Sequence, residues 1–302
     1  MTSARRIVIV TCREWPALSV SDSALAAELR RRGHTVVALP WNDAPLDGFT
    51  SADAVILRSN WDFHHDLASF DHWLVEVDKS SAELHNPAAI VRRFNHKSYL
   101  HDFAGLGIPT PATLRVDSFD DGAISKWMQQ RGFDSVVIKP AWGASGHNVE
   151  RIRRVELGRA RARWEAEPDR RDVLVQEFVP DISNGETALV FFGHRFSHAL
   201  HRQPDAQDFR VNSQYGGTMT LASHVDREAR ALAEAVMGTI PAALTYARVD
   251  IVGSGSTVRL MELEVNEPAL GLHLAPGSAV RFADALLSPS DRRGSVKTPR
   301  ST

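Results

Sequence analysis

Residues 245–268, TYARVDIVGSGSTVRLMELEVNEP, place acidic and amide side chains on two strand-like runs that flank a Gly/Ser turn. Successive side chains of a strand point to opposite faces. On the second run we expect an apolar face made of Met261, Leu263 and Val265. The opposite face then carries Glu262, Glu264 and Asn266. Side chains of these types, gathered on one face, can bind a cation.

The first run adds a carboxylate to this face if the two runs form a hairpin. Pairing of Val252 with Val258 across the turn would put Asp250 beside the other polar side chains. Several carboxylates on one face repel one another unless a cation neutralises them. For an isolated hairpin there is a simpler explanation, in which the glutamates are solvated or paired with Arg248.

A second candidate for chemistry is the segment at residues 135–148, SVVIKPAWGASGHN. It predicts a strand that ends at Lys139, followed by a loop of small residues at 143–146. Backbone N–H groups of such a loop can close over phosphate oxygens, and the lysine supplies a positive charge to the same group. The order of residues is not that of a Walker A loop, and there is no GxGxxG motif. A plain surface hairpin is the alternative.

A third candidate is VLVQEFVPDISNGETAL at residues 173–189. The predicted strand runs into QEFV at residues 176–179, whose backbone could read the adenine amino group. Glu186 could bind ribose hydroxyls, because a carboxylate accepts hydrogen bonds from them.

The elements that position these motifs fall into two regions. The first 92 residues alternate strand and helix, which predicts a small parallel α/β domain: strands at 6–10, 36–39 and 54–57 and a helix at 22–32 that Gly33 ends. Ligands bind at the carboxyl ends of such strands. Arg58 follows one of them and could hold a substrate carboxylate, or form an exposed salt bridge.

The second region is predicted to be mixed α+β. A helix is expected at 95–106, with further helices at 121–131, 156–165 and 226–238. Strands are expected at 135–139, 173–178, 188–192, 247–252 and 258–265. Residues 288–302 form a polar, basic tail without periodicity.

Composition excludes several classes of protein. The chain has 302 residues, 43% of them hydrophobic, and a net charge of −2, so no basic field points to nucleic acid. Arginines at 150–172 alternate with acids, as on a solvated helix face. The single cysteine, Cys12, excludes a disulfide framework, and no segment has membrane-spanning length. We expect a cytoplasmic protein that binds neither nucleic acid nor membrane.

Taken in order, the motifs resemble the ATP-grasp superfamily, and within it the glutathione-synthetase-like enzymes that form amide bonds. The resemblance covers residues 94–285 and rests on NHK ahead of GIPTPAT, then VVIKPAWGASG, VQEFV, GET, DFRVNSQYGG, ARVD and ELEVNEP. It implies an ATP-grasp domain at 93–287, with a lid subdomain at about 110–178. Residues 1–92 fit the small parallel α/β domain that precedes it in this family.

The resemblance also implies roles for individual residues. ATP would be bound by Lys97, Lys139, Gly143, Ser145, Gly146, Gln176, Glu177, Phe178, Val179 and Glu186. One or two Mg²⁺ ions, for which Mn²⁺ can substitute, would be held by Asp250, Glu264 and Asn266, with Glu262 either a further ligand or the partner of Arg248. Acyl-phosphate oxygens would be stabilised by Arg210, Asn212, Lys139 and Arg202. The amino-acid-like substrate would meet Arg58, Ser59, Trp61, Gly216 and Gly217.

The implied activity is ATP-dependent joining of a carboxylate to an amine through an acyl phosphate, with release of ADP. RSNWDF, NHKSYL, FRVNSQYGG and LMELEVNEP are similar to enzymes that cyclise O-ureido-D-serine to cycloserine. A two-substrate ligase of the glutathione-synthetase type is the alternative, and a non-catalytic nucleotide-binding regulator is a remote one. A homodimer is compatible with the resemblance. No general base stands out among His64, His65, His198 and His201.

Overall fold

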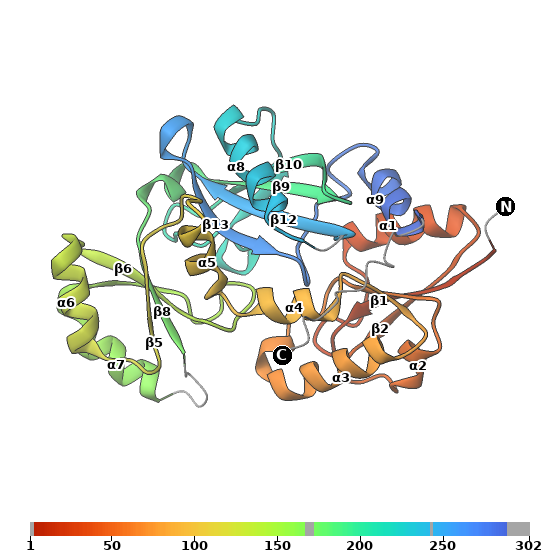
Figure 1. The fold of residues 1–302 in the computed structure, drawn as a ribbon, viewed down its shortest axis with the longest axis horizontal. Helices are drawn as coiled ribbons and strands as arrows, with labels where there is room; N and C mark the ends of the chain where they lie inside the picture. Colours follow the sequence, from red (N-terminus) through yellow and green to blue (C-terminus); the bar gives the residue numbers. More distant parts are fainter. Residues whose placement is uncertain (1–2, 167–171, 242–243, 289–302) are drawn as a thin grey trace, which may run out of the picture.

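The computed structural model describes residues 3–166, 172–241 and 244–288. Its strands form three sheets, each covered by helices (Figure 1). The predicted tail lies outside the described residues apart from Ser288. In the described part, no helix is long and apolar enough to cross a membrane.

The N-terminal sheet is parallel, in the order β2-β1-β3-β4. Its strands are β1 (Arg6–Thr11), β2 (Thr35–Pro40), β3 (Ala54–Leu57) and β4 (Glu83–His85). Its helices are α1 (Val20–Arg31), α2 (Asp47–Thr50) and α3 (Leu67–Lys79). Helix α1 begins where the Ser19 hydroxyl accepts a hydrogen bond from the Asp22 amide, as at a typical N-cap. The parallel α/β prediction is confirmed.

The central sheet is antiparallel, in the order β11-β10-β9-β12-β13. Its strands are β9 (Glu186–Phe192), β10 (Arg195–Gln203), β11 (Thr218–Leu221), β12 (Tyr246–Val252) and β13 (Arg259–Glu264). One face packs against helices α5 (Tyr99–Gly105) and α8 (Arg227–Gly238) through a buried apolar cluster. On the other face, α9 (Ser278–Leu287) joins α1 in a second cluster that also includes side chains of β1 and β3.

The third sheet is antiparallel, in the order β5-β8-β6-β7, and lies at the left in Figure 1. Its strands are β5 (Thr113–Val116), β6 (Ser135–Pro140), β7 (Glu150–Arg153) and β8 (Val173–Glu177). Helices α6 (Asp121–Arg131) and α7 (Leu157–Glu165) cover it around a separate apolar core. Short 3₁₀ turns occur at Phe63–His65, Arg154–Glu156, Pro180–Asn184, Ser213–Tyr215 and Gly255–Thr257.

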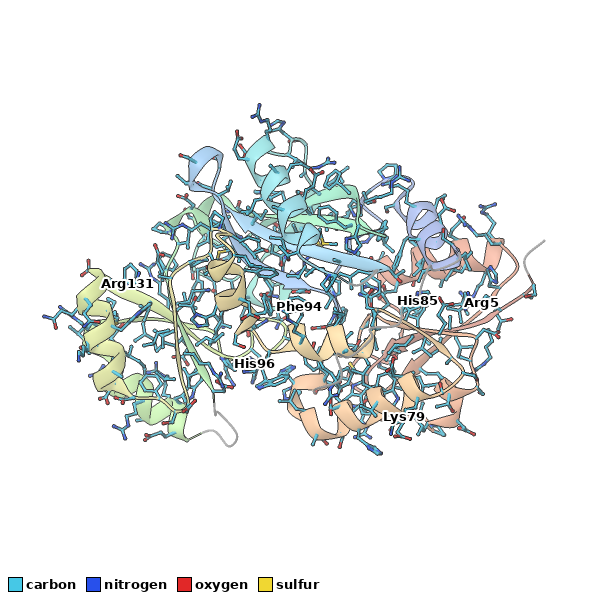
Figure 2. All side chains as sticks on the ribbon, in the orientation of Figure 1. Arg5, Lys79, His85, Phe94, His96 and Arg131 are labelled. Carbon is cyan, nitrogen blue, oxygen red and sulfur yellow. The ribbon has the colours of Figure 1, made fainter. Side chains whose placement is uncertain are left out.

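The helix predicted at 95–106 begins later than expected, and a separate helix that was not predicted precedes it. Helix α4 (Ala88–Asn95) ends at Asn95, and α5 begins only at Tyr99. Between them His96 is extended and forms an isolated bridge with Trp142, while the Lys97 amide donates to the Ala141 carbonyl at 2.9 Å. Figure 2 labels Phe94 and His96 at this passage from α4 toward the third sheet. Pairing with that sheet competes with the helix and thereby orients Lys97.

The β12–β13 hairpin differs from the prediction in register. Val252 pairs with Arg259, not with Val258, and a bulge then makes Asp250 pair with Glu262. The bulge adds one residue to β13, which restores the expected face for the carboxylates. The prediction was wrong for Met261, which does not share the face of Leu263 and Val265. It packs instead with Val179, Ile182 and Val252.

Candidate active site

A cavity lies between the central sheet and the third sheet, and two lysines line it. Lys97 comes from the α4–α5 connection and Lys139 from β6. The Lys139 ammonium donates to the Gln176 side chain at 3.0 Å. Burial, together with the positive charge of Lys97, lowers the pKa of Lys139 to about 8. A phosphate at this place would supply the missing opposite charge.

Lys97 already has an anionic partner. Its ammonium donates to the Glu262 carboxylate in a half-buried ion pair. Burial alone would lower the pKa of Lys97, but the charge and hydrogen bond of Glu262, together with the charges of Glu264 and Glu267, raise it. Glu262 therefore pairs with Lys97, and the predicted alternative of pairing with Arg248 is wrong for this residue.

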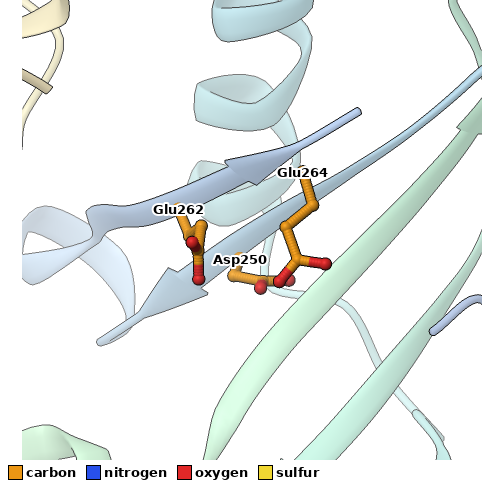
Figure 3. A group of neighbouring side chains, drawn as sticks. All are labelled: Asp250, Glu262 and Glu264. Carbon is orange, nitrogen blue, oxygen red and sulfur yellow. The ribbon is translucent and has the colours of Figure 1, made fainter. Parts of the chain in front are cut away.

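Three carboxylates meet on the polar face of the hairpin, as Figure 3 shows. Asp250, Glu262 and Glu264 each offer an oxygen, and these oxygens lie within 4.8 Å of one another. Asn266 lies close to the same strand end, where its side chain accepts from Asn60 at 2.9 Å and donates to Asn95 at 3.1 Å. Carboxylate and amide oxygens at this spacing fit Mg²⁺.

Two arginines form ion pairs with acids of this site. Arg248 is buried and donates to Asp250 at 2.7 and 2.8 Å and to Glu264 at 2.6 Å. Arg202 bonds Glu186 at 2.7 Å and reaches Asp250 at 3.3 Å. Burial, and then the charge of Asp250, raise the pKa of Glu186 to about 8. Glu186 thus lines the cavity as a buried, ion-paired group.

The opposite end of this cavity is apolar. Phe178, Val179 and Met261 belong to one cluster there, and all three line the cavity. The Glu177 carboxylate lies at this end and accepts from Arg259 at 2.6 Å and from the Ala112 amide at 3.1 Å. An apolar slot beside the backbone of β8 is suited to a flat, partly polar ring such as adenine.

The small-residue loop contacts a segment of the central domain. Ser145 and Gly146 have positive φ values of 56° and 69°. The Gln214 side chain donates to the Ser145 carbonyl at 2.6 Å, and the Tyr215 hydroxyl donates to the Gly146 carbonyl at 3.2 Å. A Cβ atom at Gly146 would lie 2.8 Å from Asn212 Oδ1, so only glycine fits there. This contact brings the loop and Asn212 together over the cavity.

Arg210 lies beside the same loop. Its guanidinium bonds Asp208 at 2.7 Å and stacks 3.4 Å from the ring centroid of Tyr215. The Arg210 side chain lines the first cavity, and so does Gly143 of the loop.

A second cavity of about 600 Å³ adjoins the first on the side of the N-terminal sheet. Of the predicted substrate residues, Arg58, Trp61 and Gly217 line it. Ser59 is buried behind the wall, where it donates to Asp22 at 2.8 Å, and Gly216 is not part of the lining. Six residues line both cavities: Ser145, Arg202, Val211, Asn212, Glu264 and Glu267.

The Arg58 side chain is buried, and its guanidinium already has hydrogen-bond partners. Its Nε donates to Asp22 at 2.9 Å and one terminal nitrogen donates to the Pro268 carbonyl at 2.7 Å. The guanidinium also lies 5.3 Å from the ring centroid of Tyr246. The predicted exposed salt bridge is therefore wrong, because the pair with Asp22 is fully buried.

Sequence reasoning missed Asp22 and Glu267. Asp22 is a buried acid on the apolar face of α1, a pattern that could have identified it. Glu267 follows Asn266 directly, and burial together with the charge of Glu264 raises its pKa to about 8. A cation placed beside this carboxylate would lower that pKa again.

The four histidines considered as bases line neither cavity. His64 and His65 lie with His147 in one group, and burial first, then the neighbouring histidines, lower the pKa of His64 to about 4. His198 hydrogen-bonds the Leu270 carbonyl at 2.8 Å, and His201 bonds Gln203 at 3.1 Å.

The site combines two lysines, a carboxylate cluster, an apolar slot and a small-residue loop. This combination suits nucleotide chemistry, and comparison with known proteins agrees. Residues 100–273, more than half of the chain, match the family model described as the prokaryotic glutathione synthetase ATP-grasp domain. The chain therefore belongs to this ATP-grasp family, and it is an ADP-forming ligase that makes carbon–nitrogen bonds. Residues 7–86 match the model of the N-terminal domain of D-cycloserine synthetase DcsG.

Individual relatives extend over both parts of the chain. The cycloserine biosynthesis protein DcsG of Streptomyces lavendulae is 30% identical over an alignment of 280 positions, and the match covers 85% of this chain and 89% of that protein. The crystal structure of D-cycloserine synthetase DcsG matches with a TM-score of 0.79 and 27% identity, covering 93% of this chain and 98% of the other. A glutathione synthetase of Rhodopseudomonas palustris is 26% identical over 80% of this chain and 78% of its own.

Proposed function

We propose that this ligase closes O-ureido-D-serine onto its own carboxylate and so forms D-cycloserine. The observation that carries the proposal is that the N-terminal part, which forms a wall of the second cavity, matches the family model of the D-cycloserine synthetase N-terminal domain. In glutathione-synthetase relatives the similarity is lower. We place the enzyme in the cytoplasm, and its amino-acid-like substrate needs no macromolecular partner.

In the proposed reaction the substrate carboxylate attacks the γ-phosphorus of ATP, and ADP leaves. The ureido nitrogen next to oxygen then attacks the acyl carbon, phosphate leaves, and the five-membered ring closes. Water then hydrolyses the carbamoyl group from that nitrogen, which takes up a proton, and the carbamic acid released decomposes to carbon dioxide and ammonia. Since electrophile and nucleophile belong to one molecule, the ring closure has the entropic advantage of an intramolecular reaction.

The roles proposed for individual residues follow from their places. Lys97 and Lys139 bind phosphates, and the slot at Phe178 and Val179 binds adenine. When bound, Mg²⁺ neutralises charge on the β- and γ-phosphates. Its proposed ligands are Asp250, Glu264 and Asn266, with Glu262 as an additional candidate.

On the acyl-phosphate side we propose Arg202, Arg210 and Asn212. Arg202 and Asn212 line both cavities, so they can face the group that passes between substrate and nucleotide. The loop at 143–146 excludes water from the acyl phosphate, which hydrolyses readily. We further propose that residues 1–92 and 93–287 act as the two functional domains, with the lid at about 110–178.

The test is ADP release with O-ureido-D-serine as the sole added substrate. We expect Mg²⁺-dependent stimulation without any added amine, formation of cycloserine, and no AMP or pyrophosphate. A two-substrate ligase is the second candidate, because glutathione synthetases match the ATP-grasp part. ADP release that stays at background with this compound and rises only with an amino acid and a separate amine would favour it.

A further inference from the structure

Glu267 lies where the two cavities meet, at a position fixed by the N-terminal part of the chain. Trp61 Nε1 donates to the Glu267 carbonyl at 3.2 Å, and Arg58 donates to the neighbouring Pro268 carbonyl. The Trp61 ring in turn packs edge-on against Trp15, with centroids 5.6 Å apart. These contacts hold the backbone from which the Glu267 side chain extends, so its carboxylate occupies a defined place at the junction of the cavities.

Three acids line the second cavity, and only one of them is left without a partner in the described part of the chain. Asp22 accepts from Arg58, from Ser59 and from Ser19 at 2.7 Å. Glu264 is held by Arg248. The Glu267 carboxylate has no hydrogen bond or ion pair to another side chain among the residues described. It also lies outside the group of oxygens formed by Asp250, Glu262 and Glu264.

The chemistry of an amino acid gives this carboxylate a use. The substrate carboxylate must lie at the junction of the cavities to reach the γ-phosphate, and the α-ammonium group is attached to the adjacent carbon. The ammonium group therefore also lies at the junction, where a buried cation needs an anionic partner. We propose that Glu267 binds the α-ammonium group of the substrate and so determines which end of the molecule faces the nucleotide. This inference rests on the proposed function.

Arg58 lines the second cavity but not the first, and it donates to the Pro268 carbonyl next to Glu267. With the ammonium group on Glu267, the side chain of the substrate extends into the second cavity, away from the nucleotide. The preferred substrates are then α-amino acids.

The experiment compares Glu267→Gln with the unmodified enzyme on two compounds. One is O-ureido-D-serine, and the other is 3-(ureidooxy)propanoic acid, which lacks only the amino group. We expect the unmodified enzyme to prefer the amino acid in kcat/KM, and Glu267→Gln to lose on the order of 10²-fold with it, mostly in KM. With the des-amino compound the two enzymes should agree within a few-fold, and KM for ATP should not change.

Two results would overturn the assignment. Equal losses on both compounds would mean that Glu267 supports the structure, and a higher Mg²⁺ requirement with a raised KM for ATP would make it a metal ligand. Glu234→Gln, on the exposed face of α8, is the matched control and should change none of these values. If O-ureido-D-serine does not stimulate the unmodified enzyme, the proposed function fails. The same comparison is then made with the amino acid that does stimulate it and its des-amino analogue, and only a selective loss supports Glu267.

Discussion

Replacement of Lys139 should slow phosphate transfer directly. Its ammonium lies in the cavity with an uncharged partner, Gln176, so its charge is available to a bound phosphate. Lys139→Ala should cost about 2–4 kcal/mol of transition-state stabilisation, or about 10²–10³-fold in kcat/KM. Steady-state ADP release measures this, and Lys126→Ala on α6 is the exposed control. If the variant keeps activity within a few-fold of the unmodified enzyme, the loop after Lys139 is not part of the phosphate site.

The three clustered carboxylates should differ in their response to Mg²⁺. Glu264→Gln and Asp250→Asn should each need roughly tenfold more Mg²⁺ for half-maximal ADP release, because each removes a charged ligand. Glu262→Gln should shift the requirement less, since Lys97 already neutralises this carboxylate. Thermal unfolding of each variant without ligands controls for loss of the arginine pairs. Equal shifts at all three positions would make Glu262 a full member of the metal site.

Residue types on the hairpin predicted the carboxylate cluster, the strand and small-residue loop at 135–148 predicted Lys139, and the family resemblance supplied Lys97. Asp22 and Glu267 were missed for a physical reason. The two acids differ in their hydrogen-bond partners. Asp22 accepts hydrogen bonds from Arg58 and two serines, whereas Glu267 has no side-chain partner in the described part. The contacts of Arg58 and Ser59 with Asp22, and of Trp61 with the backbone of Glu267, join residues distant in the chain and have no local signature in the sequence.

At the scale of elements, the last turn of α1 is stabilised by an acid that should matter only above a certain pH. Glu28 pairs with Arg31 at 2.8 Å and with Arg32 at 2.7 Å, and these hydrogen bonds lower its pKa to about 2. The stabilisation is present above the ordinary pKa of 4.5 and is lost as the pH falls from there toward 2. At pH 7, Glu28→Gln should reduce the free energy of unfolding by roughly 1 kcal/mol.

Urea unfolding at pH 7 and at pH 3 checks this expectation. The difference between Glu28→Gln and the unmodified chain should shrink at pH 3, because Glu28 is then protonated in the unfolded chain and part of the stabilisation of the folded chain is lost. A difference that stays constant between the two pH values would show that the ion pairs do not stabilise α1.

Periodicity predicted most elements closely, including α6 and α8, but not the bulge in β13 or the break between α4 and α5. Both exceptions arise from pairing with distant segments. The extra residue in β13 sends Met261 to the nucleotide side, and the bridge to Trp142 ends the helix before Lys97. Local spacing carries no information about such partners.

At the scale of the whole molecule, the N-terminal and central sheets share a core. Phe282 on α9 is fully buried and stacks on Phe192 of β9, with centroids 4.6 Å apart, while Leu25 and Leu29 of α1 belong to the same cluster. Phe282→Ala should lower the free energy of unfolding by about 3–5 kcal/mol. Tryptophan fluorescence, to which the buried Trp41 and Trp73 of the N-terminal part contribute, and far-UV circular dichroism should shift together. Separate transitions would mean that the two parts unfold independently.

The ion pair between Lys97 and Glu262 has a consequence for how nucleotide enters. Glu262 already serves as the counter-ion of Lys97, so a triphosphate that binds there shares this lysine with the carboxylate. Part of the charge of Glu262 is then left facing Asp250 and Glu264, where a metal would relieve the repulsion. Nucleotide without a divalent cation should therefore bind poorly, and the protein should bind the metal–nucleotide complex more tightly than the free nucleotide.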